Sequence, residues 1–185
     1  MNRVMRLLRG KPSTTQSTAA LWTKSLVGAF LFFGVFMVVL PAAPHYLLPT
    51  VLPLPPLLRT WGGGALFIVG VGVWTICHDA FSRRGRGTPA PTDAPRHLVT
   101  DGLHGLMRNP LIAGELMVIW GEALYLSSLG FIGYAVLMTF FAQWVVVRVE
   151  EPELRARFGE HFEAYCRDVP RWLPRSRAAR PMRKG

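Results

Sequence analysis

The chain has 185 residues, which is enough for one domain, and half of them are hydrophobic whereas only 17% are charged. No Lys, Arg, Asp or Glu occurs from residue 25 to residue 58, and residues 111–147 contain only Glu115 and Glu122. A soluble domain would scatter charges over every surface segment. The composition therefore excludes an ordinary soluble fold and predicts an all-α integral membrane protein.

Four apolar stretches approach the roughly 20 residues that a helix needs to cross the hydrocarbon core. They are residues 21–40, 61–76, 111–129 and 131–147, and we expect each to be a transmembrane helix. The second is rich in glycine, which permits close helix packing. The first also resembles a signal peptide, with Pro41-Ala42-Ala43 as a cleavage site, but its length favours an uncleaved helix.

The basic residues are unevenly distributed along the chain. They gather in an N-terminal segment (residues 1–20), in the loop 83–107 and in the tail after Arg148. Residues 41–58, which are rich in proline, and residues 127–130 contain no Lys, Arg, Asp or Glu. The positive-inside rule then places both termini in the cytosol. It also explains the net charge of +10 better than nucleic-acid binding does. Residues 41–58 are expected to form a non-cytosolic loop that cannot be regular helix throughout.

The tail from residue 150 to residue 168 has the spacing of an amphipathic helix. Its apolar side chains recur at intervals of three and four residues: Leu154, Phe158, Phe162, Tyr165 and Val169. We expect this helix to lie across the cytosolic ends of the spans and to end at Pro170.

The clearest candidate for chemistry lies where the third span begins. Asn109 is a good N-cap, and Pro110 suits the first helical position. A helix N-terminus carries partial positive charge, and Arg108 adds a full charge, so a carboxylate or phosphate would bind well there. The alternative is that Arg108 only reaches out to a lipid phosphate.

Four acidic residues are the other candidates. Glu150 and Glu151 stand where the fourth span ends and could hold a cation or the hydroxyls of a ribose, unless they only favour the start of the tail helix. Glu115 and Glu122 share one face of the third span, where carboxylates are costly. Glu115 could pair with Arg108, and a structural role is favoured for Glu122.

Metal binding and disulfide formation are not expected. Neither the histidines nor Cys77 and Cys166 have the spacing of metal ligands, and the two cysteines fall in an apolar span and in the basic tail. His97 and His104 lie in the loop before the third span.

An ordered set of short motifs runs from residue 87 to residue 174. It comprises Gly87-Thr88-Pro89, Leu98-Val99 with Gly102, Arg108-Asn109-Pro110, Glu150-Glu151 with Leu154, Phe158-Gly159, and Tyr165 with Val169-Pro170-Arg171-Trp172. This order resembles the isoprenylcysteine carboxyl methyltransferase and phospholipid methyltransferase family. The resemblance implies a methyltransferase-like membrane domain over residues 21–185, with its cofactor region at 87–174.

The resemblance also implies S-adenosylmethionine as the cofactor and a lipid or prenylated acceptor that enters from the bilayer. The cofactor would be held by Arg96, His97, Leu98, Val99, His104, Asn109, Pro110, Leu111, Ile112 and Glu150, with Glu151 as a second carboxylate. Arg108 would meet the cofactor's carboxylate, and His104 or Glu115 would take a proton from an amine acceptor. A multi-pass protein of a bacterial inner membrane is expected, since the chain is rich in Ala and Arg.

Three positions depart from the family pattern. His104 and Ile112 stand where the family often has Tyr, and Val146 stands where the prenylcysteine enzymes place an Arg for the acceptor. Two other functions therefore stay open. One is an NADPH-dependent enzyme similar to the sterol reductases, and the other is a non-catalytic lipid-binding scaffold.

Overall fold

The computed structural model describes residues 17–89 and 93–174, and all regular secondary structure within them is helical. The expected all-α fold is therefore confirmed. Most of the N-terminal segment 1–20 lies outside the described residues.

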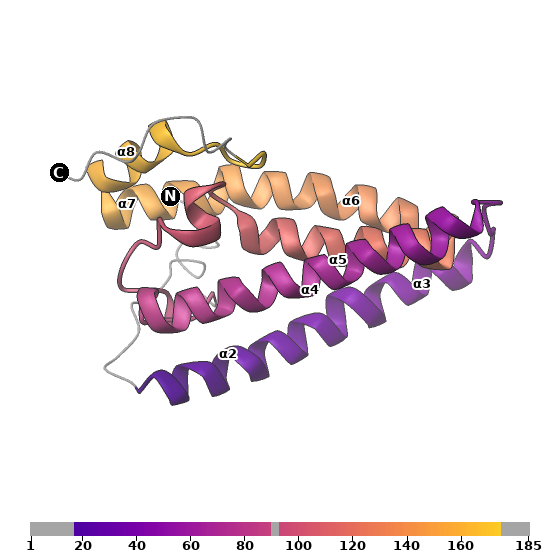
Figure 1. Cartoon of the computed structure of the whole chain (residues 1–185), viewed down its shortest axis with the longest axis horizontal. Helices are drawn as coiled ribbons and strands as arrows, with labels where there is room; N and C mark the ends of the chain where they lie inside the picture. Colours follow the sequence, from indigo (N-terminus) through magenta and orange to yellow (C-terminus); the bar gives the residue numbers. More distant parts are fainter. Residues whose placement is uncertain (1–16, 90–92, 175–185) are drawn as a thin grey trace.

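Four long helical segments lie side by side (Figure 1). The first comprises α2 (Thr18–Phe33), the π-helix η1 (Gly34–Val39) and α3 (Leu40–Leu47), and the second comprises η2 (Leu57–Gly62), α4 (Gly63–Ala80) and η3 (Phe81–Gly85). The third is α5 (Pro110–Leu126). The fourth comprises α6 (Leu129–Val145), η6 (Val146–Glu150) and α7 (Glu151–Phe158), and a short helix α8 (Glu160–Asp168) follows.

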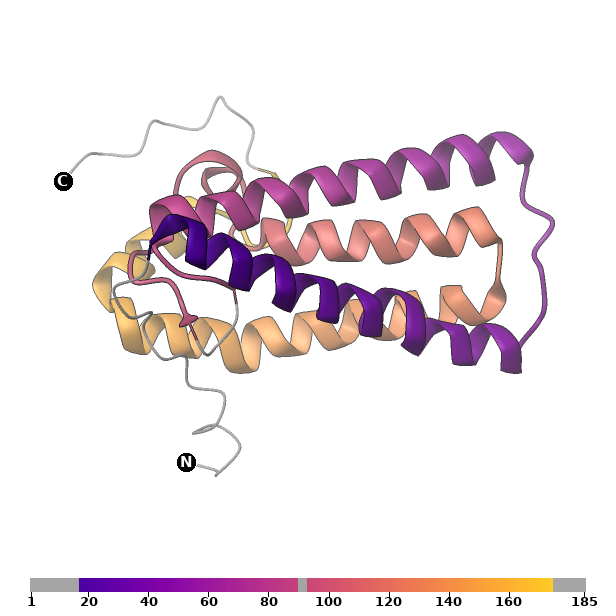
Figure 2. The same ribbon diagram turned by 90° about the horizontal axis from the view of Figure 1, so that it is seen from below.

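The first helical segment runs obliquely across the others (Figure 2). α2 packs against η3 and α4 at one end of the bundle, and α3 packs against α6 at the other. We name these ends the loop end, which holds residues 86–89 and 93–109 with α7 and α8, and the turn end, which holds residues 48–56 and the α5–α6 turn. At the turn end, the N–H of Leu52 donates to the carbonyl of Ser127 over 2.7 Å.

Two helices are long and apolar enough to cross a membrane, fewer than the four predicted. They are Leu57–Gly85 and Leu129–Phe158, of 29 and 30 residues. The apolar helix Gly34–Leu47 is shorter, and α5 has only 17 residues. Large apolar side chains on the long helices point outward, with Ile68 70% and Phe140 73% exposed. Lipid, rather than water, is the solvent that such faces require.

The predicted boundary of the first span at residue 40 is wrong, because the helix continues through Pro41 and Pro44 to Leu47. The π-helix η1 ends at Val39, two residues before Pro41. In a π-helix the carbonyl of Phe36 would accept from residue 41, but proline has no N–H to donate. The hydroxyl of Tyr134 in α6 donates to that carbonyl over 2.7 Å. This bond anchors the first helix to α6.

The predicted single helix over 150–168 is also wrong, because two helices meet there. α7 continues α6 without a break, and Gly159, at φ +52°, turns the chain so that α8 folds back. The apolar side chains of both helices then face each other in one cluster: Leu154, Phe158, Phe162, Tyr165 and Val169, together with Leu98 of the preceding loop. The predicted apolar residues do pack together, but the positive φ of Gly159 divides them between two helices.

α4 and α5 are in backbone contact through glycines. A Cβ atom at Gly63 would lie 2.9 Å from the carbonyl oxygen of Gly121, and one at Gly70 would lie 2.7 Å from that of Gly114. The expected close packing of the glycine-rich span is therefore confirmed. The seven-residue spacing on both helices keeps these glycines on the facing sides.

Gly70→Ala should destabilise the protein by roughly 1–3 kcal/mol, because the added methyl group must push two backbones apart. Gly72→Ala is the matched control, since a Cβ there would have nothing within 4 Å. Thermal unfolding of both variants in detergent measures the difference. Equal unfolding temperatures would show that the α4–α5 contact is looser than described.

Candidate functional site at the loop end

The start of α5 is held by the C-terminal tail. Pro110 takes the first helical position as predicted, but the Asn109 side chain makes no capping bond. Its Nδ2 lies 3.4 Å from the carbonyl oxygen of Arg171, and the backbone N–H of Asn109 donates to the same oxygen over 3.3 Å. The N–H of Arg108 donates to the carbonyl of Pro170 over 2.8 Å. The expected side-chain cap is therefore replaced by a bond to the tail.

Glu151 lies at the centre of a buried ion cluster. It is 5% exposed, and its carboxylate accepts two hydrogen bonds from Arg171, at 2.7 Å from Nε and 3.0 Å from Nη2. The Nη2 of Arg108 lies 3.2 Å from the same carboxylate. Two guanidinium groups share one carboxylate, so the cluster retains a net positive charge. Bidentate geometry of this kind orders both partners.

Arg108 keeps an unused donor within this cluster. Its side chain is only 13% exposed, and its Nε is buried without a hydrogen-bond partner in the part of the chain that the structure describes. The helical geometry of α5 also leaves the N–H groups of Leu111 and Ile112 without intrahelical acceptors. Three donors beside a net positive charge favour an anionic group.

His104 lies in the loop before α5, at the same end of the bundle as the ion cluster. The hydroxyl of Tyr165 donates to the carbonyl of His104 over 2.6 Å, and burial raises the pKa of the Tyr165 phenol, so it stays protonated. The imidazole of His104 packs edge-on against Phe81, with ring centroids 5.1 Å apart. Burial, together with the charge of Arg84, lowers the pKa of His104 to about 4. Its buried Nδ1 has no partner among the described residues.

Two further acidic side chains approach this region. The carboxyl groups of Glu115 and Glu150 are close enough to interact electrostatically. Tyr165 interacts in the same way with both Arg108 and Glu150. The structure therefore gathers five of the predicted residues at the loop end: His104, Arg108, Glu115, Glu150 and Glu151.

The predicted loop residues contribute mainly through their backbone. The N–H groups of Arg96 and His97 both donate to the carbonyl of Gly85, which fixes the loop to the end of η3. The side chain of His97 is exposed, Leu98 packs into the α7–α8 cluster, and Val99 is buried. Leu98 and Val99 therefore pack into the protein, whereas the His97 side chain stays accessible to a ligand.

Sequence reasoning missed several polar residues at this end of the bundle. Arg171 was part of the tail motif, but only its two bonds to Glu151 reveal its place in the cluster. His78 and Ser82 are buried on one face of the α4–η3 helix, and neither the Nδ1 of His78 nor the Oγ of Ser82 has a partner in the described residues. A histidine inside an apolar stretch was the signal that could have found them.

Metal chemistry has no site in the described residues, because they contain no group of three or more His, Cys, Asp and Glu side chains able to hold an ion. Cys77 and Cys166 are free thiols in this structure.

These features define a helical membrane protein with a buried, positively charged site at one end of its bundle. Residues 58–161, more than half of the chain, match the phospholipid methyltransferase family, and the chain belongs to that family. Membership confirms the resemblance seen in the motifs and implies a methyltransferase of the membrane. No curated protein matches the chain.

Glu151→Gln should destabilise the protein by roughly 2–5 kcal/mol, because it leaves two partly buried cations without a counter-charge. Glu160→Gln makes the same chemical change at an exposed position of α8 and should shift stability by less than about 0.5 kcal/mol. Chemical unfolding in detergent provides the comparison. Equal losses in the two variants would contradict a central role for the Glu151 cluster.

His104 should make stability depend on pH. Since its folded pKa is about 4 and its ordinary value 6.5, the unfolded chain binds the extra proton first as the pH falls. The free energy of unfolding is therefore highest above pH 6.5. It falls by up to roughly 3 kcal/mol as the pH falls to about 4. His104→Gln should flatten the unfolding free energy over this range. His161→Gln, at an exposed position, should leave the slope unchanged.

Proposed function

We propose that this protein transfers a methyl group from S-adenosylmethionine to a lipophilic acceptor that reaches the loop end from the bilayer. The observation that carries the proposal is the buried Arg108–Glu151–Arg171 cluster at the N-terminus of α5, with its net positive charge and unused donors. The family to which residues 58–161 belong supports methyl transfer as the reaction.

The donors at the loop end fit the ionic groups of this cofactor. Its carboxylate would be held by the Nε of Arg108 and by the N–H groups of Leu111 and Ile112, which need an acceptor. Glu150 would accept hydrogen bonds from the ribose hydroxyls or the ammonium group. Glu151 already binds two arginines, so its role is to position Arg108 rather than to contact the ribose.

When bound, the cofactor supplies a methyl group on a sulfonium, which leaves as a thioether with the electron pair of its carbon–sulfur bond. The chain's own residues align the reactants and exclude water, which is most of what such a displacement requires. An acceptor that carries a proton needs a base as well. His104 is the proposed partner for that proton, because it is neutral at pH 7 and its Nδ1, in the tautomer that leaves this atom unprotonated, can accept a hydrogen bond from the acceptor.

The membrane arrangement proposed with this function has all four long helical segments crossing the bilayer and the loop end in the cytosol. The basic loop after η3 and the basic tail support this orientation. A water-soluble cofactor would then meet a membrane-borne acceptor at the loop end.

Binding of S-adenosylhomocysteine tests the cofactor assignment. We expect calorimetry on the detergent-purified chain to give micromolar affinity for S-adenosylhomocysteine and none for NADPH. Glu150→Ala and Arg108→Ala should each weaken the binding by about 1.5–3 kcal/mol, because each removes a charged hydrogen-bond partner.

Arg167→Ala, at an exposed position of α8, is the matched control and should bind normally. Thermal unfolding of Arg108→Ala shows whether that variant is folded, and Glu150→Ala tests the site without breaking the ion cluster. Binding of NADPH alone would refute the proposal. Affinities within about twofold of the unaltered chain in both site variants would refute the site.

A further inference from the structure

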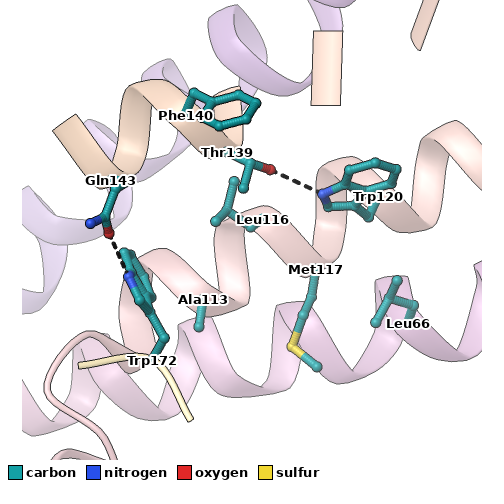
Figure 3. A pocket seen from close by; sticks show the side chains of 9 residues that line it. All are labelled: Leu66, Ala113, Leu116, Met117, Trp120, Thr139, Phe140, Gln143 and Trp172. Atoms are coloured by element: carbon teal, nitrogen blue, oxygen red, sulfur yellow. Dashed lines mark hydrogen bonds between the residues drawn. The ribbon is translucent and has the colours of Figure 1, made fainter. Parts of the chain in front are cut away.

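An apolar groove of about 560 Å³ opens beside the loop-end site (Figure 3). It is formed by α4, α5, α6 and the tail. The side chains that line it are all uncharged: Leu66, Ala113, Leu116, Met117, Trp120, Thr139, Phe140, Gln143 and Trp172. Ala113 lies one turn into α5, and Trp172 directly follows Arg171, so one end of the groove adjoins the ion cluster.

The surroundings of the groove indicate a hydrocarbon occupant. Four of its lining residues belong to α5, and four others belong to the two helices that are apolar enough to span a membrane, Leu57–Gly85 and Leu129–Phe158. Phe140 at its edge is 73% exposed, and Leu137 one turn earlier is 63% exposed. A groove bordered by outward-facing apolar side chains opens to lipid, so a lipid chain reaches it more readily than a water-soluble molecule does.

The polar groups of the groove are few and mostly engaged with each other. The indole N–H of Trp172 donates to the Oε1 of Gln143 over 2.6 Å, and that of Trp120 donates to the hydroxyl of Thr139 over 3.1 Å. The Thr139 hydroxyl donates in turn to the carbonyl of Ala135. The amide NH₂ of Gln143 is the group left to bind a ligand's oxygen or sulfur.

Cations are absent from the groove lining. At the end of the groove that adjoins the ion cluster, Arg171 binds Glu151 through two donors, and the remaining donor of Arg108, its Nε, is taken by the cofactor's carboxylate in the proposed function. The fully buried Val146, one turn beyond Gln143, also offers no charge. A carboxylate or phosphate in the groove would lose its hydration without gaining a counter-ion, which is costly. An uncharged head avoids that cost.

We propose that the groove binds one hydrocarbon chain of an acceptor whose reactive head is uncharged, such as an alcohol, a phenol or a thiol, and that the Gln143 amide selects this head. The volume suits one small lipophilic molecule, since such sites measure roughly 300–1,000 Å³. That the bound molecule is a methyl acceptor rests on the proposed function. Its binding in the groove can be measured without any methyl transfer.

Tryptophan fluorescence tests the proposal directly, because Trp120 and Trp172 both line the groove. The probes are a long-chain alcohol and the matching fatty acid, each brominated at mid-chain so that contact quenches the indoles, added to the detergent-purified chain at pH 8. We expect saturable quenching by the alcohol, and binding of the ionised acid that is at least about tenfold weaker.

Three variants locate the effect. Ala113→Phe fills the groove and should abolish saturable quenching, whereas Ala65→Phe, at an exposed position of α4 outside the groove, should preserve it. Gln143→Arg adds the missing cation and should reverse the preference in favour of the acid. The reversal is a readout that general destabilisation of the protein would not produce.

Equal or tighter binding of the acid by the unaltered chain would overturn the proposal, as would quenching that Ala113→Phe leaves intact. A third outcome would also overturn the proposal: quenching that falls as the protein concentration rises, at a fixed concentration of alcohol. It would show that a second copy of the chain covers the groove. S-adenosylhomocysteine binding in the same samples separates the two proposals. Binding of the alcohol without binding of S-adenosylhomocysteine would refute only the proposed function. Binding of S-adenosylhomocysteine without binding of the alcohol would refute only the groove assignment.

Discussion

The buried carboxylate of Glu151 is the constraint on which the loop end depends. It joins three parts of the chain that are distant in sequence: the start of α7, the loop that leads into α5 and the tail after α8. Charges so far from water are stable only when they are paired, so the cluster fixes the relative positions of all three parts. The tail's carbonyl bonds to Arg108 and Asn109 reinforce the same arrangement. A site for an anionic group results because the two arginines outnumber the one carboxylate.

Much of the fold could be predicted because it follows from apolar length and charge placement. The helical segments, the short turn before α6 and the start of α5 at Pro110 were all readable from the sequence. The errors arose where one local feature overrides a pattern. A π-helix and a hydroxyl from another helix let the first helix pass through Pro41. The positive φ of Gly159 divides an amphipathic run that looked continuous.

The candidate site was less predictable than the fold. The motifs identified Arg108 and Glu151, but pairing between them depends on the path of the chain through α6 and α7, which no local pattern records. Arg171 belongs to the site only because the tail returns to the start of α5. The groove likewise combines residues of three helices and the tail, all of them apolar or neutral. A search for chemically reactive residue types would pass over it.

The short length of α5 has a consequence for the depth of the site. Gly114, near the start of α5, lies level with Trp74 of α4, and α4–η3 continues for another eleven residues to Gly85. Since α5 itself continues four residues from Gly114 to Pro110, the neighbouring helix extends about seven residues, or roughly 10 Å, past the start of α5. The fourth helical segment also runs on to Phe158. The N-terminus of α5 therefore lies below the ends of the helices beside it, and the tail bonds of Arg108 and Asn109 cover it from the loop end. The space that the short helix leaves is filled by the chain's own polar backbone, so a buried ion cluster can lie level with the bodies of the longer helices.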